Sequence, residues 1–391
     1  MRDTNLSYFK PTSPLENFLC SAIAMNSERD LITTYNELGD KDVWDAASAN
    51  RIAPVVGYKL MNLLGEEKTP RHWLESYNEN HKKISAYLEE LDRIAEILSS
   101  SGIPLIALKN GGIARGIYQV PGCVPMGDID TLVRRSDFRS AHKILSEIGY
   151  VISAPNRLEK ADVDHGFRTG GSEYSTTLPN GLPLWLELQW RPIAGRWLPS
   201  SREPKADALI ERSTEIKGSS VRLLAPEDNL LQVALHTAKH SYVRAPGFRL
   251  HLDVDRIVKG QRINWDSFMQ RVADLKVTVP VYFSLAIPSI LFNTQIPREV
   301  LRYLRPKRWK RNLLSSKIKK AGLFYPDNSK FGKLEYILFT SLLFDDFKGL
   351  MEGIFPEKTW MKDTYDFNNN ILLPYYHLKR LIDLMFRRMP V

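Results

Sequence analysis

Residues 126–133 read MGDIDTLV and place two aspartates one residue apart within an apolar run. Side chains alternate between the two faces of a strand, so Asp128 and Asp130 would point to one side and Ile129 to the other. Two carboxylates this close repel each other and lose hydration unless a cation lies between them. The pattern therefore predicts a cation site on one face of a short strand.

A third carboxylate lies on a second predicted strand. LPLWLELQW, residues 182–190, alternates as a half-buried strand does, and its apolar face carries Leu184, Leu186, Leu188 and Trp190. Glu187 shares the opposite face with Trp185 and Gln189, so it would point into a cleft rather than into the apolar layer. If the two strands are neighbours, the three carboxylates come together, and hard oxygen ligands of this kind suit Mg²⁺.

A segment suited to phosphate binding precedes these strands. IPLIALK, residues 103–109, predicts a short strand, and Asn110, Gly111 and Gly112 follow it as a turn before a short helix over 113–118. Glycines let a backbone approach a phosphate closely, and Lys109 supplies a positive charge. Two plainer interpretations stay open: Lys109 as a solvated charge at a strand end, and the paired aspartates as a device that keeps a sheet edge soluble.

The rest of the chain supplies helices on both sides of these strands. Before residue 102, ISAYLEELDRIAEILSSSG has the spacing of an amphipathic helix that ends at Gly102, and another helix is expected over 137–149. Further helices are expected at 227–241, 249–260, 264–275 and 279–293. The pattern predicts an α+β fold with a small mixed β-sheet in a minimal core between N-terminal and C-terminal helical domains. The expected domains are residues 1–101, 102–222 and 223–391.

Composition favours a cytoplasmic protein without a membrane partner. The 391 residues include two cysteines, the N-terminus lacks the order of a signal peptide, and no apolar run approaches the roughly 20 residues that cross a bilayer. Residues 301–320 contain nine Lys or Arg and no acid, a local excess of positive charge equal to the net charge of +9 of the whole chain. Tyr303 and Trp309 lie among these cations. This stretch either holds nucleic acid or an acidic partner, or is a solvated surface that attracts anionic nucleotides.

Several basic residues outside the strands are candidates for the same cleft. His236 and His240 lie four residues apart, beside Lys239, on the side of their predicted helix opposite its apolar stripe. They would line the cleft near phosphate, form a metal pair, or belong to a solvated face. His165 falls in a polar, Gly-rich loop ahead of the Glu187 strand, and Arg249 either pairs with an acid one turn away or reaches the cleft.

These segments resemble a known superfamily. The runs IPLIALKNGG, GDIDTLVRRSDF, LELQWR and APEDNLLQVALHTAKH are similar to those of the polymerase-β-like nucleotidyltransferases. More narrowly, they resemble the bacterial uncharacterised nucleotidyltransferases, in which a helical domain lies on each side of a minimal catalytic core. The resemblance extends over nearly the whole chain, and DIDTLV with the downstream ELQWR is its most specific part.

The resemblance implies transfer of a nucleotidyl group from an NTP, with Mg²⁺ or Mn²⁺ bound and pyrophosphate released. Asp128 and Asp130 would hold the ions that bind the triphosphate, and Glu187 would complete the site for the ion that activates the acceptor. The residues expected to contact the nucleotide are Lys109, Asn110, Gly111, Gly112, His236, Lys239 and His240. The residues expected to contact the other substrate are His165, Gln189 and Arg249.

Three positions depart from the superfamily pattern. Asn110 replaces the glycine that usually follows the lysine, Val124 replaces a basic residue four positions before the first aspartate, and Gln189 replaces a histidine. The acceptor is expected to be a small molecule, a sugar, a peptide or a protein. The alternatives are a catalytically degenerate module that binds nucleotide or RNA, and a toxin–antitoxin or natural-product tailoring enzyme.

Overall fold

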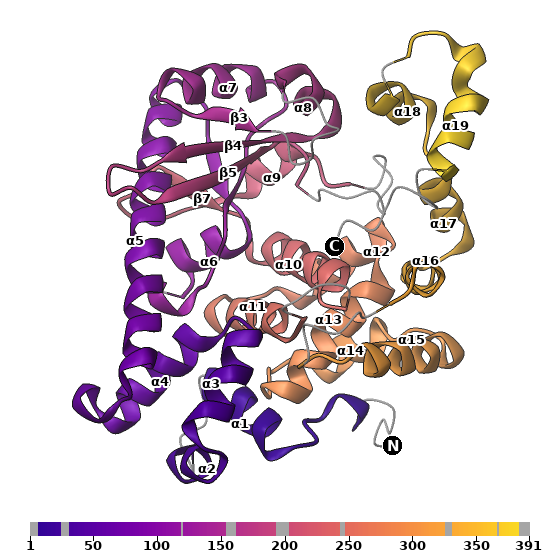
Figure 1. Cartoon of the computed structure of the whole chain (residues 1–391). Coiled ribbons are helices and arrows are strands. Elements are labelled where there is room, and N and C mark those ends of the chain that lie inside the picture. Colours follow the sequence, from indigo (N-terminus) through magenta and orange to yellow (C-terminus); the bar gives the residue numbers. More distant parts are fainter. Residues whose placement is uncertain are drawn as a thin grey trace.

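The predicted α+β architecture is confirmed, with a sheet-containing core between helical regions. The computed structural model describes residues 7–24, 31–118, 120–153, 162–192, 203–242, 247–324, 331–365 and 367–382. In Figure 1 the strands lie in the upper part of the molecule, the indigo N-terminal helices below them, and the orange C-terminal helices beside those.

The N-terminal region is helical up to the start of the sheet. Its main element is α5 (Arg71–Ser100), whose buried stripe includes Ile84, Leu91 and Leu98, as the spacing predicts. Helix α5 runs along the sheet in Figure 1 and ends where Gly102 adopts a φ of 74°. The shorter elements of this region are η1 (Ser7–Phe9), α1 (Pro14–Ile23), α2 (Leu31–Leu38), α3 (Asp40–Ala49), α4 (Ala53–Leu64) and η2 (Glu66–Lys68).

The sheet has seven strands in the order β3-β4-β5-β2-β1-β7-β6. Their bounds are β1 (Leu105–Ala107), β2 (Ile129–Leu132), β3 (Val151–Ser153), β4 (Gly171–Thr177), β5 (Pro183–Gln189), β6 (Thr214–Glu215) and β7 (Val221–Leu223). The pairs β2–β5 and β1–β7 are parallel, and the other pairs are antiparallel, so the sheet is mixed as predicted. The strands that carry the predicted carboxylates, β2 and β5, are direct neighbours near its centre.

The two faces of the central strands pack against different partners. One face meets α9 (Ala206–Arg212) in a small core formed by Ile106, Leu108, Leu132, Ala206, Leu209, Ile210 and Leu224. The opposite face joins the main core, to which Leu105, Ala107 and Ile129 contribute. Alternation along β2 therefore places Asp130 on the same face as Leu132.

Two expectations for the core are wrong in their local structure. The turn expected after Lys109 is the first turn of α6 (Lys109–Gly116), so helix replaces both that turn and the start expected at 113. A Cβ at residue 112 would lie 2.8 Å from the Ala107 carbonyl oxygen, so Gly112 lets the helix begin directly against β1. His165 lies in α8 (Val163–Thr169) instead of a loop, because Asp162 accepts a hydrogen bond from its backbone N–H and caps the helix.

The remaining elements follow the predicted pattern closely. The helix expected over 137–149 is α7 (Phe138–Glu147), and η3 (Pro121–Cys123) precedes β2. The four expected C-terminal helices are α10 (Pro226–His240), α11 (Gly247–Gly260), α12 (Trp265–Leu275) and α13 (Thr278–Leu291). Helix α10 packs against the other three.

The chain continues as shorter helices after α13. They are α14 (Arg298–Tyr303), α15 (Arg308–Ala321), α16 (Lys333–Leu342), α17 (Phe347–Ile354), α18 (Lys358–Tyr365), η4 (Asn370–Leu372) and α19 (Leu373–Ile382). Figure 1 shows α16 to α19 along one edge of the molecule. Within the described residues, every helix is too short or too polar to span a bilayer.

Candidate functional site

Asp130 and Glu187 are partners across neighbouring strands. The register of β2 on β5 pairs Asp130 with Glu187, so both side chains leave the sheet on one face. Asp130 is buried with 6% of its surface exposed, whereas Asp128, just before β2, is exposed. The prediction that these strands bring carboxylates together is confirmed for Asp130 and Glu187.

Lys109 is the counter-ion of this pair. Its Nζ lies 2.5 Å from Oδ1 of Asp130 and 3.8 Å from Oε2 of Glu187, and its side chain is only 20% exposed. The position follows from the fold, because α6 begins at Lys109 directly after β1, and β1 is the other neighbour of β2. The interpretation of Lys109 as a solvated strand-end charge is therefore wrong.

Gln189 is a buried hydrogen-bond donor to Asp130. Its side chain is 1% exposed, and its Nε2 donates a hydrogen bond of 3.1 Å to Oδ1 of Asp130. Its Oε1 is buried and has no hydrogen-bond partner among the described residues. Gln189 therefore orients the Asp130 carboxylate from a buried position. Its predicted contact with substrate stays a prediction.

The carboxyl groups of Asp128 and Glu187 resist ionisation where they lie. Burial raises the pKa of Glu187 to about 8, against the lowering effect of the Lys109 charge and with a further rise from Asp130. The pKa of Asp128 is raised as well, first because neighbouring protein atoms partly desolvate its carboxylate and then because of the charge of Asp130. Burial lowers the pKa of Lys109, but the nearby carboxylates outweigh it and raise the pKa. The cluster favours an additional cation.

Glu173 extends the acidic row and was missed in the sequence. The register of β4 on β5 pairs it with Glu187, so Asp130, Glu187 and Glu173 lie side by side across β2, β5 and β4. GSEYSTT around it has the alternation of a strand, with Tyr174 buried and Glu173 on the other face. That alternation was the available signal, in a segment whose strand character is otherwise weak.

A histidine of α10, His236, lies within electrostatic range of Lys109. Burial lowers the pKa of His236 far below its usual value, and the charges of Lys109, His240, Lys239 and Arg249 lower it further. His236 is therefore a neutral imidazole within range of Lys109. The rings of His236 and His240 lie 4.7 Å apart. This arrangement supports the cleft-lining interpretation of the HTAKH segment over the solvated-face interpretation.

Helix α11 holds the segment that leads to the aspartates. Nη1 of Arg249 donates a hydrogen bond of 2.6 Å to the Pro125 carbonyl, and Nη2 of Arg256 donates one of 2.6 Å to the Cys123 carbonyl. The Arg256 guanidinium also lies 4.5 Å from the centroid of the Tyr118 ring. These contacts join residues far apart in the sequence and fix the backbone just ahead of Asp128.

Helix α5 holds the same segment from the other side. Nδ2 of Asn80 donates to the Gly122 carbonyl at 2.9 Å, and Nζ of Lys83 donates to the Met126 carbonyl at 3.1 Å. Burial lowers the pKa of Lys83, whereas the charge of Asp128 raises it, so the two side chains are within electrostatic range. Lys83 was not identified from the sequence, because its position on a long amphipathic helix carries no distinct signal.

Two departures from the superfamily pattern have a structural explanation. Val124 is fully buried, and the cations near Asp128 come instead from Lys83 on α5 and Arg249 on α11. Asn110 joins α6 to α11, since its amide nitrogen donates to both carboxylate oxygens of Asp253 at 3.2 and 3.1 Å in the orientation that satisfies both groups. The described contacts place no His165 atom against the carboxylates, because α8 packs on β4 and α7.

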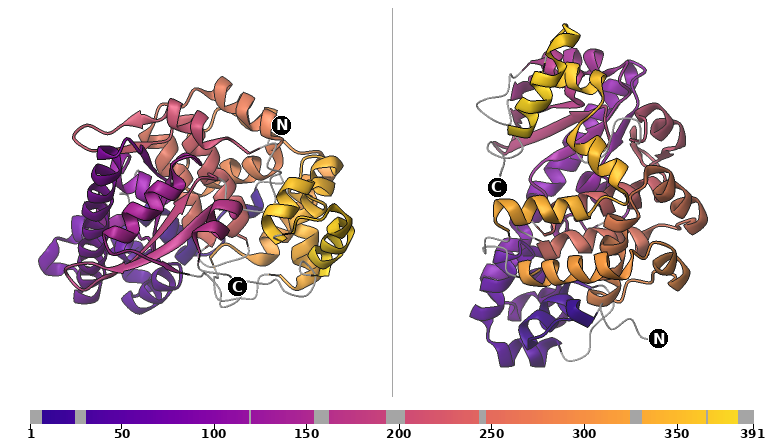
Figure 2. Two further views of the ribbon diagram at one scale, coloured as in Figure 1. Left: turned by 90° about the horizontal axis from the view of Figure 1, so that it is seen from above. Right: turned by 90° about the vertical axis from the view of Figure 1, so that its right-hand side faces the viewer.

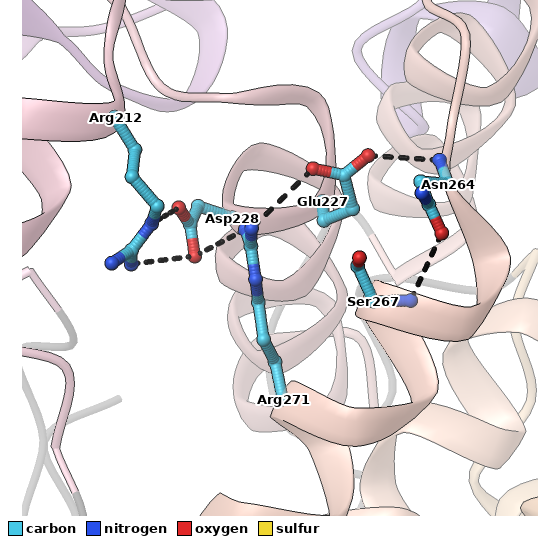
Figure 3. Close-up of polar contacts among 6 residues, drawn as sticks. All are labelled: Arg212, Glu227, Asp228, Asn264, Ser267 and Arg271. Carbon is cyan, nitrogen blue, oxygen red and sulfur yellow. Dashed lines mark hydrogen bonds and ion pairs between the residues drawn. The ribbon is translucent and has the colours of Figure 1, made fainter.

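The N-terminal end of α10 is anchored by a cluster of ion pairs and hydrogen bonds around Glu227 and Asp228, which we name the polar joint. Figure 3 shows Asp228 between Arg212 of α9 and Arg271 of α12, with ion pairs of 2.9 and 2.8 Å. The Asp228 side chain is 3% exposed. Glu227 beside it accepts a hydrogen bond of 2.8 Å from the Asn264 backbone N–H. The joint fixes the start of the helix whose other end carries the histidines.

Asp128, Asp130 and Glu187 have the ligand chemistry that a hard divalent cation prefers, but Lys109 already contacts Asp130. Carboxylate oxygens are the preferred ligands of Mg²⁺. Desolvation and the neighbouring carboxylates raise the pKa values of Asp128 and Glu187, and a bound cation would favour their ionised forms. In the described part of the chain no group of three or more His, Cys, Asp or Glu side chains is arranged to hold a metal ion. A metal ion bound to Asp130 would have to share that carboxylate with the Lys109 ammonium or displace it.

Comparison with known families agrees with this geometry. A family model described as uncharacterised nucleotidyltransferase matches residues 36–293, which include every site residue above. A comparison with curated proteins finds no match. The match covers more than half of the chain, from within α2 to the residues just after α13. The chain therefore belongs to the family of uncharacterised nucleotidyltransferases.

Proposed function

We propose that the chain is a metal-dependent nucleotidyltransferase that moves an NMP group from an NTP to an acceptor. The observation that carries the proposal is the pairing of Asp130 with Glu187 around the Lys109 ammonium, on two neighbouring strands near the centre of the sheet. Arg249 of α11 lies within electrostatic range of Asp128, and Lys239 of α10 lies, like Lys109, within electrostatic range of His236. Carboxylates that can hold a metal ion, with cations nearby that can bind phosphates, suit a metal–triphosphate complex.

The chain's own residues would bind and orient the two substrates. Lys109, Lys239 and Arg249 supply positive charge for the triphosphate, and the neutral His236 supplies a hydrogen-bonding group beside them. Asp128, Asp130 and Glu187 would hold Mg²⁺ or Mn²⁺, which when bound would neutralise the triphosphate and align it. An acceptor oxygen would then attack the α-phosphorus, the bond to the β-phosphate oxygen would break, pyrophosphate would leave, and the acceptor proton would pass to solvent.

The acceptor is proposed to be a small molecule, a sugar, a peptide or a protein. Because one transfer chemistry can serve many acceptors, acceptor choice is proposed to reside in the flanking helices rather than in the carboxylates.

A second candidate is a nucleotide-binding module without transferase activity. The observation in its favour is Lys109, which takes the place of a cation beside Asp130. In such a module the nucleotide phosphates would bind Lys239 and Arg249, while Lys109 would stay paired with the carboxylates.

The experiment that tests both candidates uses NTPs labelled at the α-phosphate, Mg²⁺ or Mn²⁺, and a cell extract as the source of acceptor. Transfer predicts a labelled product that Asp130→Asn abolishes, while Glu215→Gln, on the exposed end of β6, keeps it. A melting temperature raised by NTP, with no label transferred under any condition, supports the module and contradicts the enzyme.

A further inference from the structure

The most basic part of the chain lies on α14, α15 and the residues between them. No Asp or Glu occurs between Glu299 and Asp327, while residues 301–320 hold nine Lys or Arg. Arg302, Lys307 and Arg308 are exposed. In the right-hand view of Figure 2 the orange helices of this region face the viewer at the surface. The region lies outside residues 36–293, which the family model matches.

Two large aromatic side chains are exposed among these cations. Tyr303 is 55% exposed and Trp309 is 59% exposed. Lys310 lies 5.9 Å from the centroid of the Trp309 ring and donates a hydrogen bond to the Phe344 carbonyl, which holds its ammonium beside the indole. We name residues 302–309 the 302–309 surface.

The N-terminal end of α15 adds to the positive character of this surface. The first turn of α15 contains no acid and begins with Arg308. Cations at a helix N-terminus oppose the helix dipole, at a typical cost of about 0.3–1 kcal/mol each, so this end of α15 favours an anion. By contrast, Lys317 and Lys320 near the C-terminal end pair with Glu335 at 3.4 and 3.2 Å.

We propose that the 302–309 surface binds single-stranded nucleic acid. Arg302, Lys307 and Arg308 would contact phosphates, and unpaired bases would stack on Tyr303 and Trp309. Stacking requires bases that are not already enclosed in a duplex, so the exposed rings favour single strands over double strands.

The observations favour nucleic acid over an anionic membrane. The large apolar side chains that α15 exposes among the described residues are Trp309 and Leu313, the latter 39% exposed. An interfacial helix buries a continuous apolar face in the headgroup region, and two side chains one turn apart are too few for that.

The test measures binding without NTP or metal, so its outcome is independent of the proposed transferase activity. Fluorescein-labelled oligo(U) and oligo(dT) of about 20 nucleotides, longer than a typical single-strand site, are titrated with the full chain by fluorescence polarisation. Lys307→Glu combined with Arg308→Glu should weaken binding at least tenfold, and Trp309→Ala should weaken it about fivefold or more, as expected for loss of one stacked base.

The matched control carries the same change in net charge. Lys143→Glu combined with Lys41→Glu reverses two lysines that are 78% and 85% exposed, on α7 and α3, and far in sequence from the surface. It should bind within about twofold of the wild type, because remote exposed charges are screened beyond about 10 Å at 0.1 M salt. Melting curves verify that all variants fold.

Three outcomes would overturn the proposal. The first is equal loss in the control, which would indicate general charge attraction. The second is binding to phosphatidylserine vesicles without binding to either oligonucleotide. The third is an affinity for oligonucleotide that Trp309→Ala and the 307/308 charge reversal both leave unchanged.

Discussion

The Lys109 ammonium lies 2.5 Å from Asp130 and 3.8 Å from Glu187, which face each other across β2 and β5. A lysine in this place acts as the internal counter-ion of the acidic row. Because the same carboxylates are the proposed metal ligands, Lys109 and a divalent cation compete for them. The lysine would then be released toward the triphosphate when the metal binds.

Replacing Lys109 should therefore destabilise the metal-free protein and strengthen its response to metal. Lys109→Met leaves Asp130 buried without its partner, and breaking a buried ion pair typically costs about 3 kcal/mol. Urea unfolding with and without Mg²⁺ measures both effects. Mg²⁺ should restore more stability to the variant than it adds to the wild type.

The matched control for this prediction is Lys82→Met, at an exposed position on α5. Its free energy of unfolding should stay within about 0.5 kcal/mol of the wild type, as for most surface changes. If Lys109→Met and Lys82→Met unfold alike without metal, Lys109 is not the counter-ion of the carboxylates.

Loosening the segment before Asp128 should weaken metal binding without removing a ligand. Arg256 is 4% exposed and donates to the Cys123 carbonyl, so Arg256→Gln frees the backbone that positions Asp128. Loss of a group that orients a metal ligand typically costs 10- to 100-fold in affinity, about 1.4–2.7 kcal/mol. Mn²⁺ titration followed by electron paramagnetic resonance measures the affinity.

A second readout separates positioning from general damage. Hydrogen exchange of the amides in residues 121–128 should be faster in Arg256→Gln, while that of β4 stays as in the wild type. The control is Lys259→Gln on the same helix, which loses a pair with Asp255 of 2.9 Å and leaves the segment untouched. Equal Mn²⁺ affinity in both variants would refute a positioning role for Arg256.

The polar joint of Figure 3 should be a main source of stability between the core and the C-terminal helices. Asp228 is buried between two arginines, and Asp228→Asn removes the charge while keeping the size of the side chain. The free energy of unfolding should fall by about 3 kcal/mol, because both arginines lose their buried partner. Asp266→Asn, in the exposed first turn of α12, is the control and should change stability by less than about 1 kcal/mol. Similar urea midpoints for the two variants would show that the joint is energetically neutral.

The sequence predicted the elements of the site better than their contacts. Alternation located β5 and the carboxylate face, because strand faces are set by local periodicity. It did not reveal the Lys109–Asp130 pair, since a lysine before two glycines fits a turn as well as the first turn of a helix. The contacts of Arg249 and Arg256 with residues 123–125 were also beyond reach, because they depend on how α11 packs against the core. Glu173 was missed because the strand character of its segment is weak, and because only strand register places it beside Glu187.

His251 should make the protein sensitive to acid. The side chain is fully buried, and burial lowers its pKa from 6.5 to about 3. The Ser241 hydroxyl donates to the Gly247 carbonyl and accepts from Nε2 of His251 at 2.9 Å, so the ring is neutral with its proton on Nε2. The folded pKa lies below the unfolded value, so the unfolded state binds a proton first as the pH falls.

The contribution of His251 is therefore complete above about pH 6.5 and is lost progressively as the pH falls toward 3. Between pH 7 and pH 5 the loss amounts to about 2 kcal/mol, at 1.36 kcal/mol for each pH unit below the unfolded pKa. His251→Gln keeps a donor for Ser241 and does not titrate, so it should lose that much less stability over this range. His81→Gln, an exposed histidine on α5, should keep the wild-type dependence. Urea unfolding at pH 7 and pH 5 measures the difference, and parallel losses in wild type and His251→Gln would show that His251 is not the acid-sensitive group.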